Sequence, residues 1–190
     1  MTYFNPGRFV KTFHSKQNEE IIIRYPIWED LDELVRYINK ISKEDTYITF
    51  SGEPISRDEE IAYLTSCFRN MEHGNSIILF AVCGAQIIGT CSVDRVFTHR
   101  RRAQHVGSFG ITVEKEFRNK GIGYVMAESV INEAKSRMKG LEVVILDVYS
   151  ENEKAIKMYE KLGFKHGGKI PKGLKYKDRY LDDVKMYLHF

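Results

Sequence analysis

The stretch FRNKGIGYVM, residues 117–126, combines two glycines and two cations at a junction between a strand-like run and a helical one. The first backbone N–H groups of a helix have no intrahelical partner and lie at the positive end of its dipole. A phosphate bound there accepts several hydrogen bonds without any side chain. Gly121 and Gly123 allow an anion to approach the backbone, while Arg118 and Lys120 add positive charge. The junction therefore predicts a phosphate-binding site.

Two better-known phosphate-binding patterns do not fit this junction. The dinucleotide fingerprint Gly-x-Gly-x-x-Gly would need a glycine at position 126, which is Met126. The P-loop would need Gly-Lys-Ser/Thr, whereas the order here is Lys120-Gly121-Ile122. A glycine-rich turn without a ligand stays open as an alternative when the junction is considered alone.

A second stretch, LDVYSENEKAIKMYEKLGF (residues 146–164), places an asparagine and a tyrosine seven residues apart on a predicted helix. Asn152 is a suitable helix N-cap, and Gly163 marks the helix end. Tyr159 lies two turns after Asn152, on nearly the same face. Taken alone, Tyr159 is equally well interpreted as a core tyrosine that packs beside Met158.

Apolar periodicity predicts strands that alternate with helices. The predicted strands cover residues 20–26, two runs within 76–97 that meet around Gly84, 105–113, 141–149, 165–170 and 180–190. The predicted helices cover residues 30–41, 56–68, 121–138 and 152–162. The second helix should begin at a Ser56 cap with Glu59 at the capping-box position, and we expect its inward face to carry Ile61, Leu64, Thr65 and Phe68.

This order of elements predicts a single α/β (α+β mixed) domain over residues 1–190. Its central sheet should be mixed but mostly antiparallel, with helices on both faces. The run 141–149 is too continuously apolar for a half-exposed strand, so we expect it to lie centrally. Residues 1–19 could form a flexible N-terminal extension.

The composition is that of a globular protein, with 43% hydrophobic and 12% aromatic residues. The formal charge of +3 suits an anionic small ligand and falls short of a nucleic-acid-binding footprint. Cys67, Cys83 and Cys91 show no metal-ligand spacing, which predicts reduced core thiols and no metal. Neither a signal peptide nor a membrane-spanning run is evident, so we expect a cytoplasmic protein with no membrane partner.

Together, the two stretches resemble the signatures of the GNAT superfamily of acyl-CoA-dependent N-acetyltransferases. The first is similar to the Arg/Gln-x-x-Gly-x-Gly/Ala motif, matched by Arg118, Gly121 and Gly123. The second is similar to the Asn-x-x-Ala-x-x-x-Tyr-x-x-x-Gly-Phe signature, matched by Asn152, Ala155, Tyr159, Gly163 and Phe164. The matched core runs from about residue 105 to residue 164.

The resemblance implies that acetyl-CoA is the cofactor and that the two motifs bind it. The pyrophosphate segment would comprise Arg118, Asn119, Lys120, Gly121, Ile122, Gly123 and Tyr124. The main chain of Ile111, Thr112 and Val113 would pair with the pantetheine arm like an added strand. Asn152 would contact that arm, Tyr159 would protonate the departing thiolate, and the N–H of Val113 would polarise the thioester carbonyl.

Neither motif identifies the general base. Glu53, in the loop before the second helix, and His105, at the start of the cofactor strand, are the candidates. Each has a plainer interpretation, Glu53 as a solvated loop residue and His105 as a hydrogen-bonded structural group. Glu114 and Glu116 flank the phosphate junction and are expected to face solvent.

The function implied is acetyl transfer to a primary amine of a small molecule (an amino acid, polyamine or amine antibiotic) by direct attack in a ternary complex. A protein N-terminus is the alternative acceptor, and a non-catalytic CoA-binding sensor is a further alternative. The last strands resemble those of small-amine acetyltransferases, and four residues there are candidates to line the acceptor side: Tyr176, Asp178, Asp182 and Asp183. The cationic stretch 98–105 is interpreted as a solvated loop, and relatives of this kind lead us to expect a homodimer.

Overall fold

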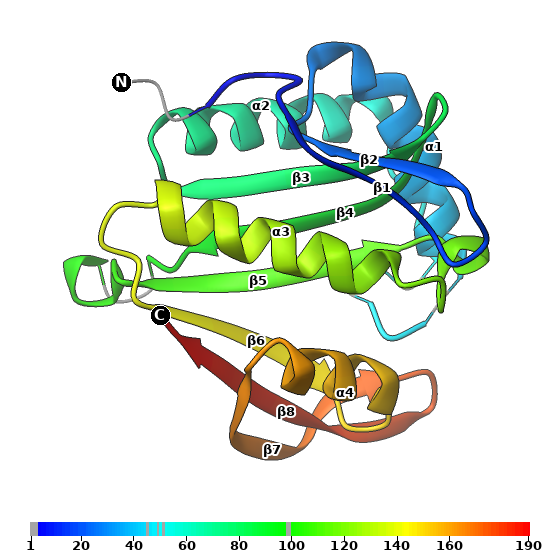
Figure 1. The fold of residues 1–190 in the computed structure, drawn as a ribbon. Coiled ribbons are helices and arrows are strands. Elements are labelled where there is room, and N and C mark those ends of the chain that lie inside the picture. Colours follow the sequence, from blue (N-terminus) through cyan, green and yellow to red (C-terminus); the bar gives the residue numbers. More distant parts are fainter. Residues whose placement is uncertain (1–3, 45, 49, 51, 98–99) are drawn as a thin grey trace.

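Eight strands form one continuous sheet in the computed structural model, which describes residues 4–44, 46–48, 50, 52–97 and 100–190 (Figure 1). The strands are β1 (Phe9–His14), β2 (Glu20–Arg24), β3 (Ser76–Cys83), β4 (Gln86–Arg95), β5 (Val106–Val113), β6 (Val143–Tyr149), β7 (Lys165–Tyr176) and β8 (Arg179–His189). Their order across the sheet is β1-β2-β3-β4-β5-β6-β8-β7. Strands β5 and β6 run parallel, and the other neighbours are antiparallel, which confirms the predicted mixed sheet.

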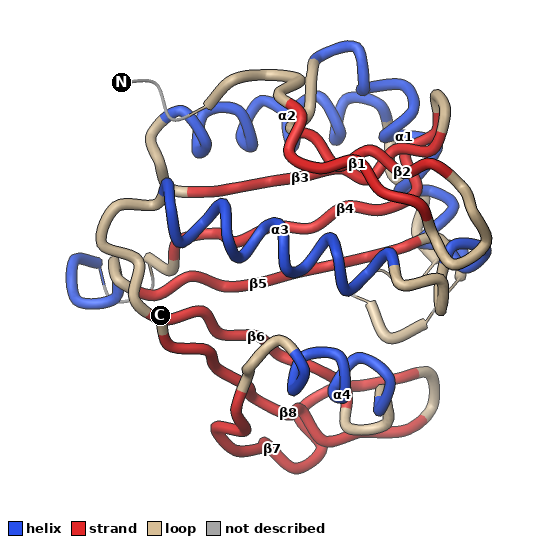
Figure 2. The backbone as a smooth tube through the Cα atoms, viewed as in Figure 1, coloured by secondary structure: helices blue, strands red, loops and turns tan. Residues whose placement is uncertain are grey.

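Helices cover both faces of the sheet, as predicted (Figures 1 and 2). They are α1 (Leu31–Lys43), α2 (Arg57–Glu72), α3 (Ile122–Arg137) and α4 (Glu153–Lys161). Helix α3 packs on β2 to β5, where the Cys91 thiol donates to the carbonyl of Met126 at 3.5 Å. Helices α1 and α2 pack on β4 and β3 from the other face, where the Tyr37 hydroxyl shares a 2.7 Å hydrogen bond with Thr112. From Gly89 to Arg95, beyond a register shift in the pairing with β3, odd-numbered side chains of β4 therefore face α3, and even-numbered ones face α1 and α2.

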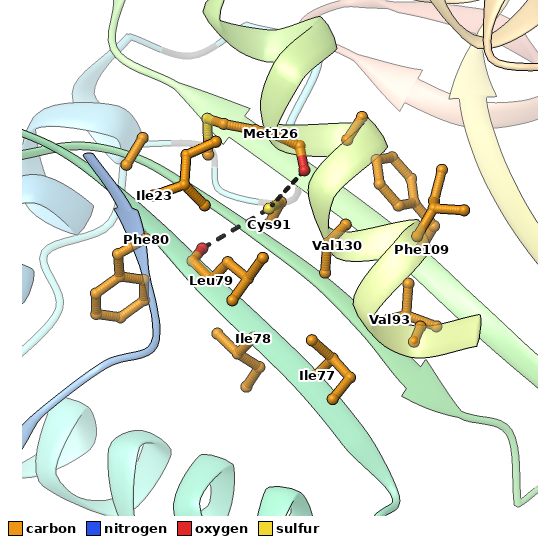
Figure 3. Close-up of a cluster of buried hydrophobic side chains, with 14 of the residues drawn as sticks. Ile23, Ile77, Ile78, Leu79, Phe80, Cys91, Val93, Phe109, Met126 and Val130 are labelled. Atoms are coloured by element: carbon orange, nitrogen blue, oxygen red, sulfur yellow. Dashed lines mark hydrogen bonds between the residues drawn. The ribbon is translucent and has the colours of Figure 1, made fainter. Parts of the chain in front are cut away.

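Figure 3 shows the apolar layer between the sheet and α3. Leu79, Cys91, Val93 and Val130 are each at most 2% exposed. Full burial of a Val or Leu side chain is worth about 1.5–3 kcal/mol relative to exposure. This layer fixes α3, and with it the glycine junction at its N-terminus, against the strands.

The turns and helix caps that the sequence predicts are present in the structure. Strands β3 and β4 form a hairpin whose two-residue turn contains Gly84 at φ +58°. Ser56 and Glu59 form the predicted capping box at the start of α2, with Glu59 N donating to Ser56 Oγ at 3.2 Å. Gly163 follows α4 at φ +94°, the left-handed conformation that ends many helices.

Two parts of the sheet differ from expectation. Residues 9–14 are not a flexible extension but form the edge strand β1, because their backbone pairs with β2 and Phe13 packs on the core. Strand β6 lies inside the sheet as expected, yet its side chains alternate in burial, with Val144 0% and Ile145 37% exposed. One face of β6 stays open because α1 and α2 pack on β4 and β3 rather than over it.

The expectation that Glu114 faces solvent is wrong. Its side chain is 0% exposed, and its two carboxylate oxygens accept from Arg36 Nη2 at 2.6 Å and Lys40 Nζ at 2.7 Å. A carboxylate can be buried here because two cations of α1 reach it. Glu116 has 59% of its side chain exposed, as expected. The Glu114 ion pairs therefore join α1 to the end of β5, beside the glycine junction.

Replacing Glu114 with alanine is expected to lower the free energy of unfolding by about 2 kcal/mol, through lost ion pairs and a new cavity. Urea denaturation measures this change. Glu116→Ala serves as the control and should change the unfolding free energy by less than about 0.5 kcal/mol. Equal stability of the two variants would show that the buried ion pairs do not stabilise the fold.

Candidate active site

The predicted phosphate junction folds into a left-handed turn at the start of α3. Gly121 is the N-cap residue with φ +86°, and Asn119 has φ +61°. Regular helical hydrogen bonding begins with Val125, whose N–H donates to Gly121 O at 3.3 Å. The N–H groups that precede Val125 are the unpaired donors of a helix N-terminus. This geometry suits the binding of phosphate oxygens by backbone N–H groups.

Both cations of the junction are engaged by neighbouring groups. Arg118 Nε donates to Val113 O at 2.7 Å, and its guanidinium pairs with Glu44 at 2.5 Å. Lys120 Nζ pairs with Glu19 at 2.7 Å. These contacts fix the junction to β5 and to the loop between β1 and β2. Because carboxylates partly neutralise both cations, the backbone N–H groups are the main donors left for an anion.

Strand β5 leaves one edge open over its second half. It pairs with β6 from Val106 to Ser108. Beyond that point the described residues continue no ladder between them, although β5 extends to Val113 and β6 to Tyr149. The two strands therefore diverge, which leaves the edge of β5 open for the added-strand pairing that the resemblance implied.

Hydrogen bonding to β4 determines which main-chain groups of β5 face the divergence. Just after β5, Glu114 N donates to Ile88 O at 2.9 Å, on the β4 side. Hydrogen-bonded positions alternate along an antiparallel strand, so even-numbered residues of β5 direct their backbone toward β4. Ile111 and Val113 therefore present their backbone to the open side. The main chain of Thr112 faces β4 instead, which corrects its predicted contact with the cofactor.

A cavity of about 690 Å³ lies where β5 and β6 diverge. Residues 108–112 of β5 and 147–149 of β6 form its walls. Tyr37 of α1 and Glu60 of α2 line it on one face of the sheet, and Tyr159 of α4 also lines it. The cavity therefore lies at the end of the open edge that begins beside the glycine junction.

Both candidate residues of the second motif reach this cavity. Asn152 is the N-cap of α4, with Oδ1 accepting from Ala155 N at 3.4 Å, so the N-cap interpretation is confirmed. The Tyr159 ring meets Phe109 edge-on, with 5.7 Å between ring centroids. Phe109 pairs with Val93, an odd-numbered position, so this contact lies on the α3 face of the sheet. Burial raises the pKa of Tyr159 to about 12, so its hydroxyl stays protonated at neutral pH.

Tyr176, predicted on the acceptor side, joins an aromatic cluster at the cavity wall. Its ring centroid lies 4.9 Å from that of Tyr47 and 6.1 Å from that of Tyr149, and both of these line the cavity. The described lining does not include the aspartates expected beside it, Asp178, Asp182 and Asp183. Two of the three pair with lysines of β7 and β8 instead.

Neither predicted general base is among the described lining residues of this cavity. His105 is exposed and precedes β5, eight residues or about 25 Å of extended chain from Val113. It borders a separate basic hollow of about 500 Å³ with Arg95 and Lys139. Glu53 is exposed in the loop before α2. Residues 98 and 99 of the cationic stretch that ends at His105 lie outside the described part of the chain.

The cavity contains a carboxylate that the sequence analysis did not select as a site residue, Glu60. It is 5% exposed, and its Oε2 has no hydrogen-bond partner within the described residues. Burial raises the pKa of Glu60 to about 7, and the neighbouring Glu59 charge adds to the rise. A carboxyl group with this pKa changes protonation near neutral pH, as a general base must.

The helical pattern of α2 contained a signal for Glu60. The buried residues of this helix are Glu60, Leu64, Cys67, Phe68 and Met71. A glutamate thus occupies the apolar stripe, four residues before a core leucine. Thr65, which we expected to face inward, is exposed, and its hydroxyl donates back to Ile61 O at 2.6 Å. A charged residue on an apolar stripe is a site candidate on physical grounds, because burial perturbs its pKa.

Within the described ranges, no three His, Cys, Asp or Glu side chains are placed to share a metal ion. None of the described helices combines the length and the apolar character that crossing a bilayer requires. The three cysteines are free thiols, with Cys67 and Cys91 buried and Cys83 partly buried.

Comparison with known proteins identifies the class to which this fold and site belong. The chain matches the family described as Acetyltransferase (GNAT) domain over residues 20–165. It therefore belongs to the GNAT family, whose members are acetyl-CoA-dependent acyltransferases.

Individual relatives agree with this assignment. The L-amino acid N-acetyltransferase AaaT of Escherichia coli K12 is 29% identical over 90 residues, which cover 47% of this chain and 54% of AaaT. The match thus spans about half the length of that relative. The structure of a GNAT-family acetyltransferase from Streptococcus pneumoniae superposes with a TM-score of 0.80 at 25% identity, covering 90% of this chain and 99% of that one.

The ribosomal L7/L12 alpha-N-protein acetyltransferase RimL, in complex with coenzyme A, superposes with a TM-score of 0.79. The alignment covers 96% of this chain and 98% of RimL, at 10% identity. At this identity, the likeness shows a shared fold alone.

Proposed function

We propose that this protein transfers the acetyl group of acetyl-CoA to a primary amine of a small molecule. The observation that carries the proposal is a continuous path from the glycine junction, along the open edge of β5, into the cavity that contains Tyr159. Acyl-CoA has its pyrophosphate, its pantetheine arm and its thioester in the same order. The chain therefore offers one site for each of these three parts, in the same order along the path.

The order along β5 supports a role for each segment. Backbone N–H groups within residues 119–124 hold the pyrophosphate. The backbone of Ile111 and Val113 pairs with the pantetheine amides. Val113 adjoins the junction, whereas Phe109 contacts Tyr159, so the reactive end of the donor lies toward Phe109. We therefore assign to Ile111 the N–H group that polarises the thioester carbonyl. Val113, which was predicted in that catalytic role, is assigned to contact with the pantetheine arm.

Two residues of α4 complete the donor side. Acetyl-CoA supplies an activated acetyl thioester. Asn152 reaches the cavity while its Oδ1 caps the helix, which leaves its amide N–H₂ as the group for contact with the arm. The protonated hydroxyl of Tyr159 donates a hydrogen bond to the departing sulfur.

A protein N-terminus is the alternative acceptor, and the shared fold with RimL is the observation that favours it. An α-amino group has a pKa of about 7.7–8.0, so neutralising it at pH 7 costs only about 1–1.4 kcal/mol. A non-catalytic CoA-binding sensor would bind acetyl-CoA without turnover. The presence of Asn152 and Tyr159 in the cavity favours catalysis over this second alternative.

Release of free CoA thiol from acetyl-CoA tests the proposal. The panel should contain amino acids, polyamines, aminoglycosides and short peptides with free N-termini. Turnover with a small amine supports the proposal, and turnover with peptides alone moves the assignment to a protein N-terminus. Binding of acetyl-CoA without any turnover would favour the sensor, and absence of binding would refute the cofactor site.

The glycine junction can be tested with Gly121→Val. We expect the KM for acetyl-CoA to rise about tenfold or more, because a branched residue disfavours φ +86° and the turn that presents the N–H groups would shift. Gly84→Val is the matched control, since it places the same strain in the β3–β4 turn, where an added Cβ meets nothing within 4 Å. A similar KM for both variants would separate the junction from cofactor binding.

The thiols support the cytoplasmic location as part of this proposal. Burial raises the pKa of Cys67 to about 12 and raises that of Cys91 further, so both stay as unreactive thiols at neutral pH. Free buried thiols fit a reducing compartment. The homodimer stays a prediction.

A further inference from the structure

The side of the cavity formed by α2 and β4 is acidic. Glu60 of α2 lines the cavity, and Asp94 lies on the face of β4 that carries Ser92, another lining residue. Both carboxylates add to the raised pKa of the Cys67 thiol, whose main cause is burial. Asp94 accepts hydrogen bonds from Ser76 Oγ at 2.5 Å and from Ser92 Oγ at 2.7 Å, and Ser92 lines the cavity. Negative charge therefore gathers at this side of the cavity.

The described lining of the cavity contains no Lys, Arg or His residue. Two cations near its wall are already paired with carboxylates, Lys185 with Asp147 at 2.8 Å and Arg179 with Glu151 at 2.6 Å. A ligand carboxylate would enter without a side-chain cation to pair with it and would face the charge of Glu60. Such like-charge contacts cost several kcal/mol.

Aromatic rings form much of the remaining wall. Tyr37, Tyr47, Phe50 and Tyr63 line the cavity on the side of α1 and α2. Aromatic faces attract an ammonium group, and their apolar area accepts the methylene groups of an aliphatic chain. The wall thus suits an alkyl chain that carries a cation.

We propose that this cavity accepts a small aliphatic amine whose positive charge is not balanced by a carboxylate of its own, such as a diamine or polyamine, and that Glu60 binds and deprotonates it. This inference rests on the proposed acetyl transfer and narrows its acceptor. It places free amino acids, the substrates named for the relative AaaT, outside the preferred class.

Glu60 supplies the step that a protonated alkylamine requires. Neutralising an amine of pKa about 10.4 at pH 7 costs about 4.6 kcal/mol. Glu60 takes one proton from the ammonium, and the neutral nitrogen then forms the new C–N bond as the C–S bond breaks. The second proton leaves the nitrogen and reaches the sulfur through the hydroxyl of Tyr159. The products are the amide, CoA thiol and protonated Glu60, which returns its proton to water.

Matched pairs of acceptors test the charge preference. Cadaverine is L-lysine without its carboxylate, putrescine has the same relation to L-ornithine, and L-leucinamide replaces the carboxylate of L-leucine by a neutral amide. We expect kcat/KM to be about 100-fold higher for the member without the carboxylate, as like-charge repulsion of several kcal/mol predicts. Equal or faster turnover of the free amino acids would overturn the inference and leave the proposed acetyl transfer intact.

The role of Glu60 is tested by Glu60→Gln, which keeps the side-chain shape. For cadaverine, wild-type kcat/KM should rise with pH as Glu60 ionises near pH 7. The variant should lose this inflection and about 10²–10⁴-fold in kcat/KM at neutral pH. Asp58→Asn, an exposed position on the same helix, is the control and should keep the wild-type profile. A wild-type profile in Glu60→Gln would remove Glu60 from the reaction.

Calorimetry separates failure of this inference from failure of the proposed function. Cadaverine should bind wild-type protein saturated with CoA, and its affinity should fall at least about tenfold in Glu60→Gln. Equal binding of cadaverine and L-lysine, or equal binding to both proteins, would refute the acidic acceptor site. The same titrations report CoA binding, whose absence would instead refute the acetyl-CoA site.

Discussion

Replacement of Tyr159 by phenylalanine is expected to lower kcat by about 100-fold or more and to leave the KM for acetyl-CoA within about twofold. The change removes one oxygen and keeps the ring contacts with Phe109 and Phe164. What disappears is a hydroxyl whose pKa burial raises to about 12. That hydroxyl is fully protonated during turnover and can donate to the departing sulfur.

The raised pKa of Tyr159 also limits how it acts. A thiol has a pKa of about 8.5, so full proton transfer from a phenol of pKa about 12 would be uphill by about 5 kcal/mol. The hydroxyl is therefore best used as a relay, which passes a proton to sulfur while it receives one from the reacting nitrogen. The pH profile of kcat should accordingly show no Tyr159 inflection below about pH 10.

Steady-state kinetics with saturating amine measures the effect of Tyr159→Phe. Tyr180→Phe is the matched control, because Tyr180 is 62% exposed on β8 and should keep the wild-type kcat. If Tyr159→Phe also kept the wild-type kcat, the leaving thiolate would depart without protein assistance. A rise in KM for acetyl-CoA with unchanged kcat would make Tyr159 a binding residue only.

The local geometry of the proposed cofactor half of the site could be predicted from the sequence, because short-range signals specify it. Gly121 must adopt a left-handed turn at a helix start, and Asn152 must cap the next helix, whatever the distant chain does. That residues alternate in direction along β5 could also be predicted from the sequence. The sequence did not show that even-numbered residues such as Thr112 face β4, because strand register is decided by the pairing partner.

The lining of the proposed acceptor half could not be predicted in the same way, because it is assembled from distant segments. Glu53 and His105 are candidates by their chemistry and by their predicted places, in the loop before α2 and at the start of β5, but neither is among the described lining residues. Glu60 becomes a candidate only when α2 packs on β3 and β4 and removes its carboxylate from water. Glu114, which we expected to face solvent, is also buried, but unlike Glu60 it forms ion pairs with two cations. Burial and partners, rather than residue type, therefore decide which glutamate can act as a base.

Glu60→Gln is expected to make the protein more stable at neutral pH while it lowers activity. In the unfolded chain the carboxyl ionises at its ordinary pKa, 4.5, whereas in the fold its pKa is about 7. Because this raised pKa favours the protonated form, wild-type stability is fully present below about pH 4.5 and is lost as pH rises through 7. The difference between the two pKa values corresponds to about 3 kcal/mol of unfolding free energy above pH 7.

Urea denaturation at about pH 4 and about pH 8 measures this difference. The variant and wild type should have similar unfolding free energies at the lower pH and differ by about 3 kcal/mol at the higher one. Asp58→Asn should track wild type at both. Cadaverine should narrow the gap by stabilising wild type alone, because a bound ammonium pairs with the Glu60 carboxylate. A gap of the same size at both pH values would mean that folding does not shift the pKa of Glu60, and that the fold does not hold this carboxyl in the pH range that a general base needs.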